Sequence, residues 1–232
     1  MFMQKPRAII PTETVAAQAV SDSKRMVIVL PGYGDTLATL KKSGVAEVIQ
    51  HNFPEAEVVL VELSLPYYME GRGVQRLHEE VVEPARRRGI RDIYLAGASM
   101  GGMGVLLYER EYPNEMRGLI LMAPFLGDAA IMQEIEASGG IEHWTPGPTP
   151  EPMNRNNTSR EEWRVVQSWT TNRERARDVW LISGASDRLH PAAEMIAPLL
   201  PTQNYISLPG GHAWRIWTQG AGEVFARIGT QR

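Results

Sequence analysis

The sequence contains no cysteine. This absence excludes disulfide bonds, thiol nucleophiles and metal sites built on thiolates, but it does not by itself indicate a cellular compartment. No apolar stretch is long enough to cross a membrane, and residues 1–22 lack the apolar core of an export signal. We therefore expect a cytoplasmic protein with no transmembrane segment, although an export signal removed ahead of residue 1 would leave no trace here.

Strong charge of one sign is also missing. The chain has 24 Lys and Arg against 27 Asp and Glu, a formal net charge of −3, and no basic block of the kind that binds nucleic acid. The longest basic run, residues 86–88, lies in a glutamate-rich stretch and is interpreted as a solvated helix face. A nucleic-acid partner is therefore not expected.

Short apolar runs alternate with amphipathic segments along most of the chain. The runs predicted to be strands are 25–30, 58–63, 93–96, 117–123, 178–183 and 205–208. The predicted helices are 37–50, 74–88 with a kink or restart at Pro84, a helix from residue 102, 191–200 and 214–228. Residues 1–24 fit an edge strand or hairpin, and 65–73 a long loop. This alternation predicts one α/β domain over 1–232, with a parallel sheet and helices on both faces.

Residues 127–177 break the alternation. They contain Pro146, Pro148, Pro150 and Pro152 and three of the six tryptophans, and they are too long for a plain connection between a strand and a helix. We interpret the segment as an insertion that forms a cap or lid over the site. The alternative is a surface excursion with no role in binding substrate.

The stretch DIYLAGASMGGMG, residues 92–104, carries the central motif. An apolar strand leads into G-x-S-x-G at residues 97–101, and a helical run follows. This is the context of a nucleophile elbow, in which Ser99 stands at the tip of a strained turn. Glycines flank the serine because neighbouring backbone passes too close for a Cβ atom. Ser99 is therefore the candidate nucleophile.

A serine hydroxyl needs a base and a carboxylate that orients the base. In open α/β sheets such groups collect at the carboxyl ends of the strands. His212 and Asp187 each follow a predicted strand by four residues and are the candidates, with Asp128 as reserve acid. The other four histidines are less suited to this role. His51 fits a surface position, His78 a charged helix face, His143 the insertion and His190 the start of a helix.

The developing oxyanion needs two converging N–H donors. The N–H of Met100, the residue after the nucleophile, is one candidate. The second is expected in the loop after strand 25–30, from Tyr33 with Gly34 as the alternative, since Pro31 has no N–H. The loop PGYG matches neither glycine-rich phosphate-binding pattern, and its other interpretation is an ordinary turn between strand and helix.

Taken together, LPGYG at 30–34, GASMGG at 97–102, Ser186-Asp187 and Gly211-His212 resemble the α/β-hydrolase superfamily. The resemblance covers 25–217, in the family's order. It implies a mostly parallel sheet of about eight strands and acyl-enzyme chemistry without metal or cofactor, with Ser99 as nucleophile, His212 as general acid–base and Asp187 as its orienter. Pro31-Gly32 stands where the family often has His-Gly. The pattern is most similar to small carboxylesterases and thioesterases.

The expected function is hydrolysis of a small carboxylic ester or thioester. Amide cleavage, acyl transfer to another acceptor and a non-catalytic ligand-binding protein are the alternatives. Aromatic residues that could line an acyl pocket, or equally pack in the core, are Tyr67, Tyr68, Trp144, Trp163 and Trp169. Arg72 and Arg76 could meet a substrate carboxylate, although solvated helix charges explain them more simply.

Overall fold

The computed structural model describes residues 5–19, 24–127, 129–149 and 157–230. These form a sheet of seven strands in the order β1-β3-β2-β4-β5-β6-β7, close to the eight expected. Edge strand β1 pairs with β3 in antiparallel fashion, and every other pairing is parallel. The strands are β1 (Thr12–Val15), β2 (Arg25–Leu30), β3 (Ala56–Val61), β4 (Asp92–Ala98), β5 (Gly118–Met122), β6 (Val179–Gly184) and β7 (Tyr205–Leu208).

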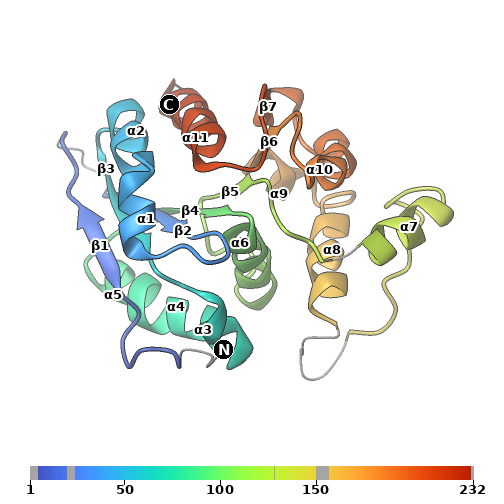
Figure 1. Cartoon of the computed structure of the whole chain (residues 1–232), viewed down its shortest axis with the longest axis horizontal. Coiled ribbons are helices and arrows are strands. Elements are labelled where there is room, and N and C mark those ends of the chain that lie inside the picture. Colours follow the sequence, from blue (N-terminus) through green and yellow to red (C-terminus); the bar gives the residue numbers. More distant parts are fainter. Residues whose placement is uncertain (1–4, 20–23, 128, 150–156, 231–232) are drawn as a thin grey trace.

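Helices cover both faces of the sheet (Figure 1), which is why the central strands are apolar almost without interruption. On one face lie α1 (Leu37–Lys42), α2 (Val45–Asn52) and α11 (Trp214–Thr230). On the other lie α3 (Leu65–Met69), α4 (Gly73–Leu77), α5 (Glu83–Arg87), α6 (Met100–Glu111) and α10 (His190–Ile196). Short helical turns are η1 (His78–Val82), η2 (Ala197–Leu199) and η3 (Thr202–Asn204).

The predicted elements hold with three differences. The helix expected over 37–50 is two helices, because Gly44 adopts a left-handed φ of 72° between them. The loop expected over 65–73 is wrong in its first half, where α3 forms behind Ser64 with Pro66 in its first turn. The helix expected over 74–88 contains the π-helical turn η1 just before Pro84. The wider turn accommodates the proline, which has no N–H to donate to the preceding turn.

The helices described between β5 and β6 are α7 (Ala129–Ala137), α8 (Thr158–Ser168) and α9 (Arg173–Arg177). Helix α8 packs along α6, and Trp163, Val166 and Trp169 belong to the same buried cluster as the α6 side of the sheet. Part of the segment predicted as a cap therefore completes the main core. Its role over the site stays a prediction.

The junction between β4 and α6 admits no side chain at Gly101. A Cβ atom there would lie 2.6 Å from the carbonyl oxygen of Leu30 and 2.8 Å from that of Pro31, both backbone atoms of β2 and its loop. Backbone on both sides of the contact belongs to the centre of the sheet and cannot give way easily. The first turn of α6 is thereby clamped to the end of β2.

We predict that Gly101→Ala lowers the free energy of unfolding by about 2–3 kcal/mol or more, from overpacking against backbone. A glycine-to-alanine change inside a helix ordinarily has the opposite sign. Urea denaturation measures the effect. Gly211→Ala is the control, because its Cβ would meet nothing nearer than Ser186 O at 3.6 Å. Equal stability of the two variants would contradict the clamp.

Candidate active site

Ser99 stands between β4 and α6 in a strained conformation, with φ 51° and ψ −111°. Such a conformation costs about 1–3 kcal/mol and persists only when its surroundings hold it. The Ser99 N–H donates to the Met122 carbonyl at 2.8 Å, and the Ser99 carbonyl accepts from Phe125 N at 2.9 Å. The ends of β4 and β5 therefore fix the turn from both sides.

His212 and Asp187 lie beside Ser99, although they are far from it in the sequence. The distance from His212 Nε2 to Ser99 Oγ is 2.9 Å. His212 Nδ1 lies 2.8 Å from Asp187 Oδ2 and 3.0 Å from Oδ1. The three residues follow β4, β6 and β7, whose carboxyl ends share one edge of the parallel sheet.

The environment of Asp187 suits an orienting carboxylate. Its side chain is fully buried, and Oδ1 also accepts the N–H of Leu189 at 2.8 Å. Both contacts are satisfied when His212 carries its proton on Nδ1, which leaves the Nε2 lone pair directed at the Ser99 hydroxyl. The imidazole packs edge-on against Trp217, with ring centroids 4.7 Å apart.

Asp35 connects the loop after β2 to the histidine loop. Its Oδ2 accepts the N–H of Gly32 at 3.0 Å and the indole N–H of Trp214 at 2.8 Å. The next residue, Thr36, caps α1 through its contact with Thr39 N. The aspartate itself was missed as a site residue, since its link to Trp214 spans most of the chain.

One expected oxyanion donor, Met100, directly follows Ser99, and the loop that carries the other, Tyr33, passes beside the serine at Gly32. Gly32 approaches the serine so closely that a Cβ on it would be 3.8 Å from Ser99 Cβ, and Tyr33 follows directly. Within the described ranges, no protein acceptor is bonded to the N–H of Tyr33 or of Met100. The Tyr33 side chain is 71 % exposed, so it points away from the core.

Several aromatic residues expected near substrate pack in the core. Trp163 is completely buried, and Trp144 donates its indole N–H to Glu134 at 2.9 Å. The Tyr67 hydroxyl accepts the N–H of Arg7, and the Arg76 guanidinium lies over its ring and pairs with Glu80. The fully buried Trp169 is likewise in the core. The Tyr68 hydroxyl is buried without a hydrogen-bond partner, and so are the indole N–H groups of Trp163 and Trp169.

The remaining candidates have other partners or lie outside the described part of the chain. His190 begins α10, as expected, and its Nδ1 contacts Ser183 Oγ at 3.0 Å. His78 bonds to the Tyr108 hydroxyl at 2.8 Å. Asp128, the reserve acid, lies outside the described residues. Among the residues that the structure describes, no cluster of His, Asp and Glu could hold a metal ion, and no helix is long and apolar enough to span a membrane.

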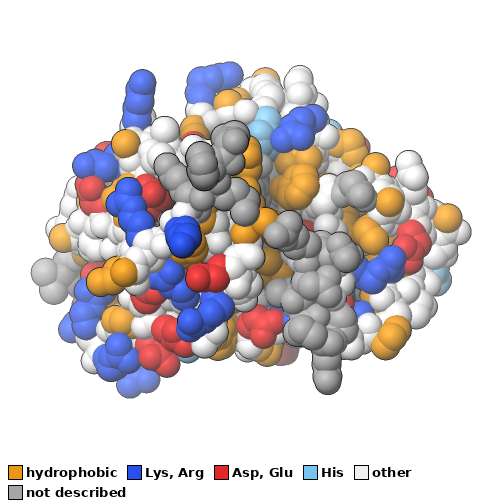
Figure 2. All heavy atoms as spheres, turned by 60° about the horizontal axis from the view of Figure 1, so that its bottom comes forward, with side chains coloured by type: hydrophobic (Ala, Val, Ile, Leu, Met, Phe, Trp, Pro, Cys, Tyr) orange, Lys and Arg blue, Asp and Glu red, His pale blue; other side chains and the backbone are white. Residues whose placement is uncertain are grey.

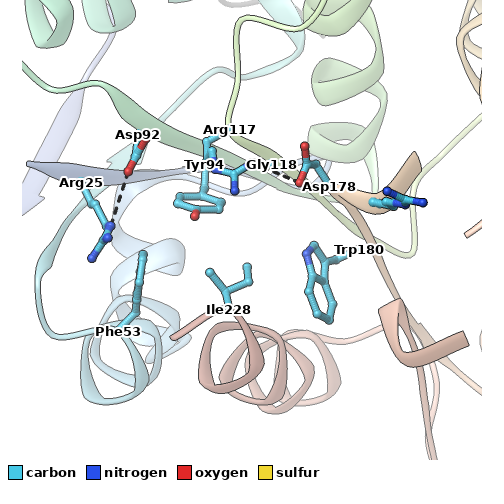
Figure 3. Close-up of a pocket in the computed structure, with 10 residues that line it drawn as sticks. Arg25, Phe53, Asp92, Tyr94, Arg117, Gly118, Asp178, Trp180 and Ile228 are labelled. Carbon is cyan, nitrogen blue, oxygen red and sulfur yellow. Dashed lines mark hydrogen bonds and ion pairs between the residues drawn. The ribbon is translucent and has the colours of Figure 1, made fainter. Parts of the chain in front are cut away.

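A cavity of about 190 Å³ lies at the opposite, amino-terminal edge of the sheet (Figure 3). Four of its five charged residues pair with one another, Arg25 with Asp92 at 3.5 Å and Arg117 with Asp178 at 3.2 Å; the fifth is Arg177. Aromatic rings form its other wall. The cavity has no contact with the edge of the sheet that carries Ser99. Its four paired charges neutralise one another.

Comparison with known proteins shows which proteins share the fold of this chain. Residues 73–165 match a family model described as serine aminopeptidase, S33. No curated protein sequence matches. Among solved structures, Est1E from Butyrivibrio proteoclasticus has a TM-score of 0.65 at 16% identity and covers 94% of this chain and 92% of its own.

Two further structures agree. S-formylglutathione hydrolase FrmB from Staphylococcus aureus has a TM-score of 0.62 at 11% identity over 98% of this chain and 100% of its own. The monoacylglycerol lipase of Paleococcus ferrophilus has a TM-score of 0.56 at 14% identity over 94% and 98%. The shared fold and the family match over residues 73–165 together show that the chain has the α/β-hydrolase fold.

Proposed function

We propose that the protein is a serine hydrolase that cleaves a small carboxylic ester or thioester through an acyl-enzyme on Ser99. The observation that carries this proposal is the continuous contact from Ser99 Oγ through the His212 imidazole to the buried Asp187 carboxylate. A hydroxyl, a base and an orienting acid in this order are the parts that nucleophilic acyl transfer requires.

In the first half-reaction, His212 Nε2 takes the proton of Ser99 Oγ as the oxygen bonds to the substrate's carbonyl carbon. The resulting imidazolium is stabilised by Asp187 and gives its proton to the departing alcohol or thiol. In the second half-reaction His212 activates a water molecule, which releases the acid and restores Ser99. Neither half-reaction uses a metal or cofactor.

The tetrahedral intermediate places negative charge on the former carbonyl oxygen. We assign its stabilisation to the backbone N–H groups of Met100 and Tyr33, which flank Ser99 without another acceptor in the described chain. Asp35 is a positioning residue in this scheme, because it fixes the loop that carries Tyr33 relative to the loop that carries His212.

The names of similar structures support an ester or thioester substrate. They include Est1E with ferulic acid bound, S-formylglutathione hydrolase and a monoacylglycerol lipase. In the space-filling view, hydrophobic side chains gather in a furrow between the α3–α5 side and the α7 side (Figure 2). We propose that an apolar acyl group lies in this furrow and that segment 127–177 acts as its cap.

Two alternatives use the same geometry. Amide cleavage or acyl transfer would also proceed through Ser99, and the serine aminopeptidase family model favours testing amides. A ligand-binding protein without catalysis would leave Ser99 unreactive. Chemical reactivity of the serine therefore separates the enzyme from the binding protein, and leaving-group preference separates the enzymes.

We expect a fluorophosphonate probe to label the wild-type protein and not Ser99→Ala, because only an activated serine attacks phosphorus. Short p-nitrophenyl esters should be hydrolysed in parallel. Absence of both labelling and turnover would contradict the proposal and favour a binding protein. A matched series of ester, thioester and anilide then ranks the leaving groups, and faster anilide cleavage would reassign the enzyme as an amidase.

His212→Ala and Asp187→Asn should each lower kcat/KM by about 10³–10⁴-fold, because the first removes the base and the second its orientation. Thermal unfolding should show little change, which excludes misfolding as the cause. Activity that survives in His212→Ala would show that the base is misassigned. A mild effect of Asp187→Asn would transfer its role to Asp128.

Asp35→Ala should lower kcat by about 10–100-fold with little change in KM, because a displaced oxyanion donor weakens binding of the transition state only. Asp35→Asn should keep most of the activity, since one side-chain oxygen accepts both N–H groups. Steady-state kinetics of both variants tests this. An equal loss in the two would point to the charge of Asp35 instead of its hydrogen bonds.

A further inference from the structure

Four described glutamates are buried, and one of them stands apart. Three pair with arginine: Glu55 with Arg25 at 2.6 Å, Glu109 with Arg175 at 2.6 Å, and Glu161 with Arg110 at 3.0 Å. Glu162, next to Glu161 on α8, is 1% exposed, and its Oε2 has no hydrogen-bond partner. No ion pair to Glu162 occurs within the described residues. An unpaired buried carboxyl is costly, so its retention calls for an explanation.

Tyr68 is a second buried group of this kind. Its hydroxyl has no partner, and it occupies the space where a Cβ of Gly104 would lie, beside the Leu30 side chain. Burial raises the pKa of Tyr68, and the negative charge of Glu162 raises it further. Burial also raises the pKa of Glu162 to about 8, so this side chain is mostly protonated at neutral pH.

These two groups lie on the same side of the sheet as the first turns of α6. Gly104 is five residues beyond Ser99 along that helix, a rise of about 7.5 Å. Leu30 ends β2, immediately before the loop of Tyr33. Helices α3, α6 and α8 lie together on this side, whereas the loop of His212 leads into α11 on the other (Figure 1).

From this arrangement we infer that Tyr68 and Glu162 form a polar subsite that binds a hydroxyl group at the far end of the substrate's acyl chain. The inference rests on the proposed esterase function. The acyl chain is assigned to this side because His212 protonates the leaving group on the other. A hydroxyl both donates and accepts, and so matches a phenol and a protonated carboxyl that each lack a partner.

The distance along α6 sets the length of the acyl chain. An extended six-carbon acyl group bonded to Ser99 reaches about as far as the rise to Gly104, about 7.5 Å. A terminal hydroxyl on such a chain would arrive near the Tyr68 hydroxyl. Ethyl 6-hydroxyhexanoate and ethyl hexanoate are therefore matched probes that differ only in the group under test.

We expect kcat/KM to be about tenfold higher for ethyl 6-hydroxyhexanoate than for ethyl hexanoate, the size of one or two hydrogen bonds to an uncharged group. In Tyr68→Phe and in Glu162→Leu this ratio should fall to about one. Acid release measured in a pH-stat gives both constants. Glu162→Leu should unfold at the same temperature as wild type or higher, because it removes an unpaired polar group.

Glu161→Gln is the matched control. It alters the neighbouring buried carboxylate, which pairs with Arg110 and Arg164, and should lower the unfolding temperature while leaving the substrate ratio at its wild-type value. If Glu161→Gln removed the hydroxyl preference as well, the effect would come from displacement of α8 and the subsite would be overturned.

The other outcomes are distinct. A ratio of one in the wild type, with both esters hydrolysed, overturns the subsite and leaves the esterase proposal standing. A preference for ethyl 6-aminohexanoate that Glu162→Gln removes would make Glu162 the partner of a cation and overturn the hydroxyl assignment. Failure to hydrolyse any ester, together with no fluorophosphonate labelling of Ser99, removes the proposed function and the subsite with it.

Discussion

The close backbone contact between the first turn of α6 and the end of β2 is the constraint on which the site depends. Gly101 touches the carbonyl groups of Leu30 and Pro31, so the helix begins directly against the central sheet. Ser99 is then forced into its left-handed conformation, and its backbone bonds to Met122 and Phe125 hold it there. The hydroxyl is presented at a fixed point, which pre-organises it for any partner that reaches that edge.

Parallel strand order brings those partners together. β4, β5, β6 and β7 are consecutive neighbours in the sheet, so the loops that follow them open at the same edge. Asp187 and His212 occupy two of these loops, and Asp35 fastens the loop after β2 to the histidine loop through Trp214. Three loops on three strands are thus joined around Ser99.

The buried charges show a contrast that bears on specificity. Glu55, Glu109 and Glu161 each bond to arginine, which offsets the desolvation of both ions. Glu162 and the Tyr68 hydroxyl have no such partner, and the other unpaired buried side-chain atoms of the described interior are the indole nitrogens of Trp163, Trp169 and Trp217. Native proteins keep few buried polar atoms unsatisfied, and those they keep are most easily understood as sites for a ligand or bound water.

Local sequence determined much of this protein. Apolar runs bounded by glycine and proline placed the six parallel strands, and the G-x-S-x-G turn with Asp187 and His212 at strand ends predicted the residues that meet at the site. These features depend on residues that lie within two to five positions of one another, so they can be recognised in the sequence itself. The division of the helix at Gly44, the short helix α3 and the η1 turn depend on competing local preferences that the pattern of apolar residues does not resolve.

Tertiary structure alone decided the rest. The burial of Trp163 and Trp169 against α6, the bond from Trp214 to Asp35, and the solitary position of Glu162 all join segments far apart in the sequence. A side chain's partner across such a distance is set by how whole helices pack on the sheet. The sequence by itself determined which candidate catalytic residues the chain carries and at which strand ends they stand; only the packing of the chain decided which polar groups were left without partners.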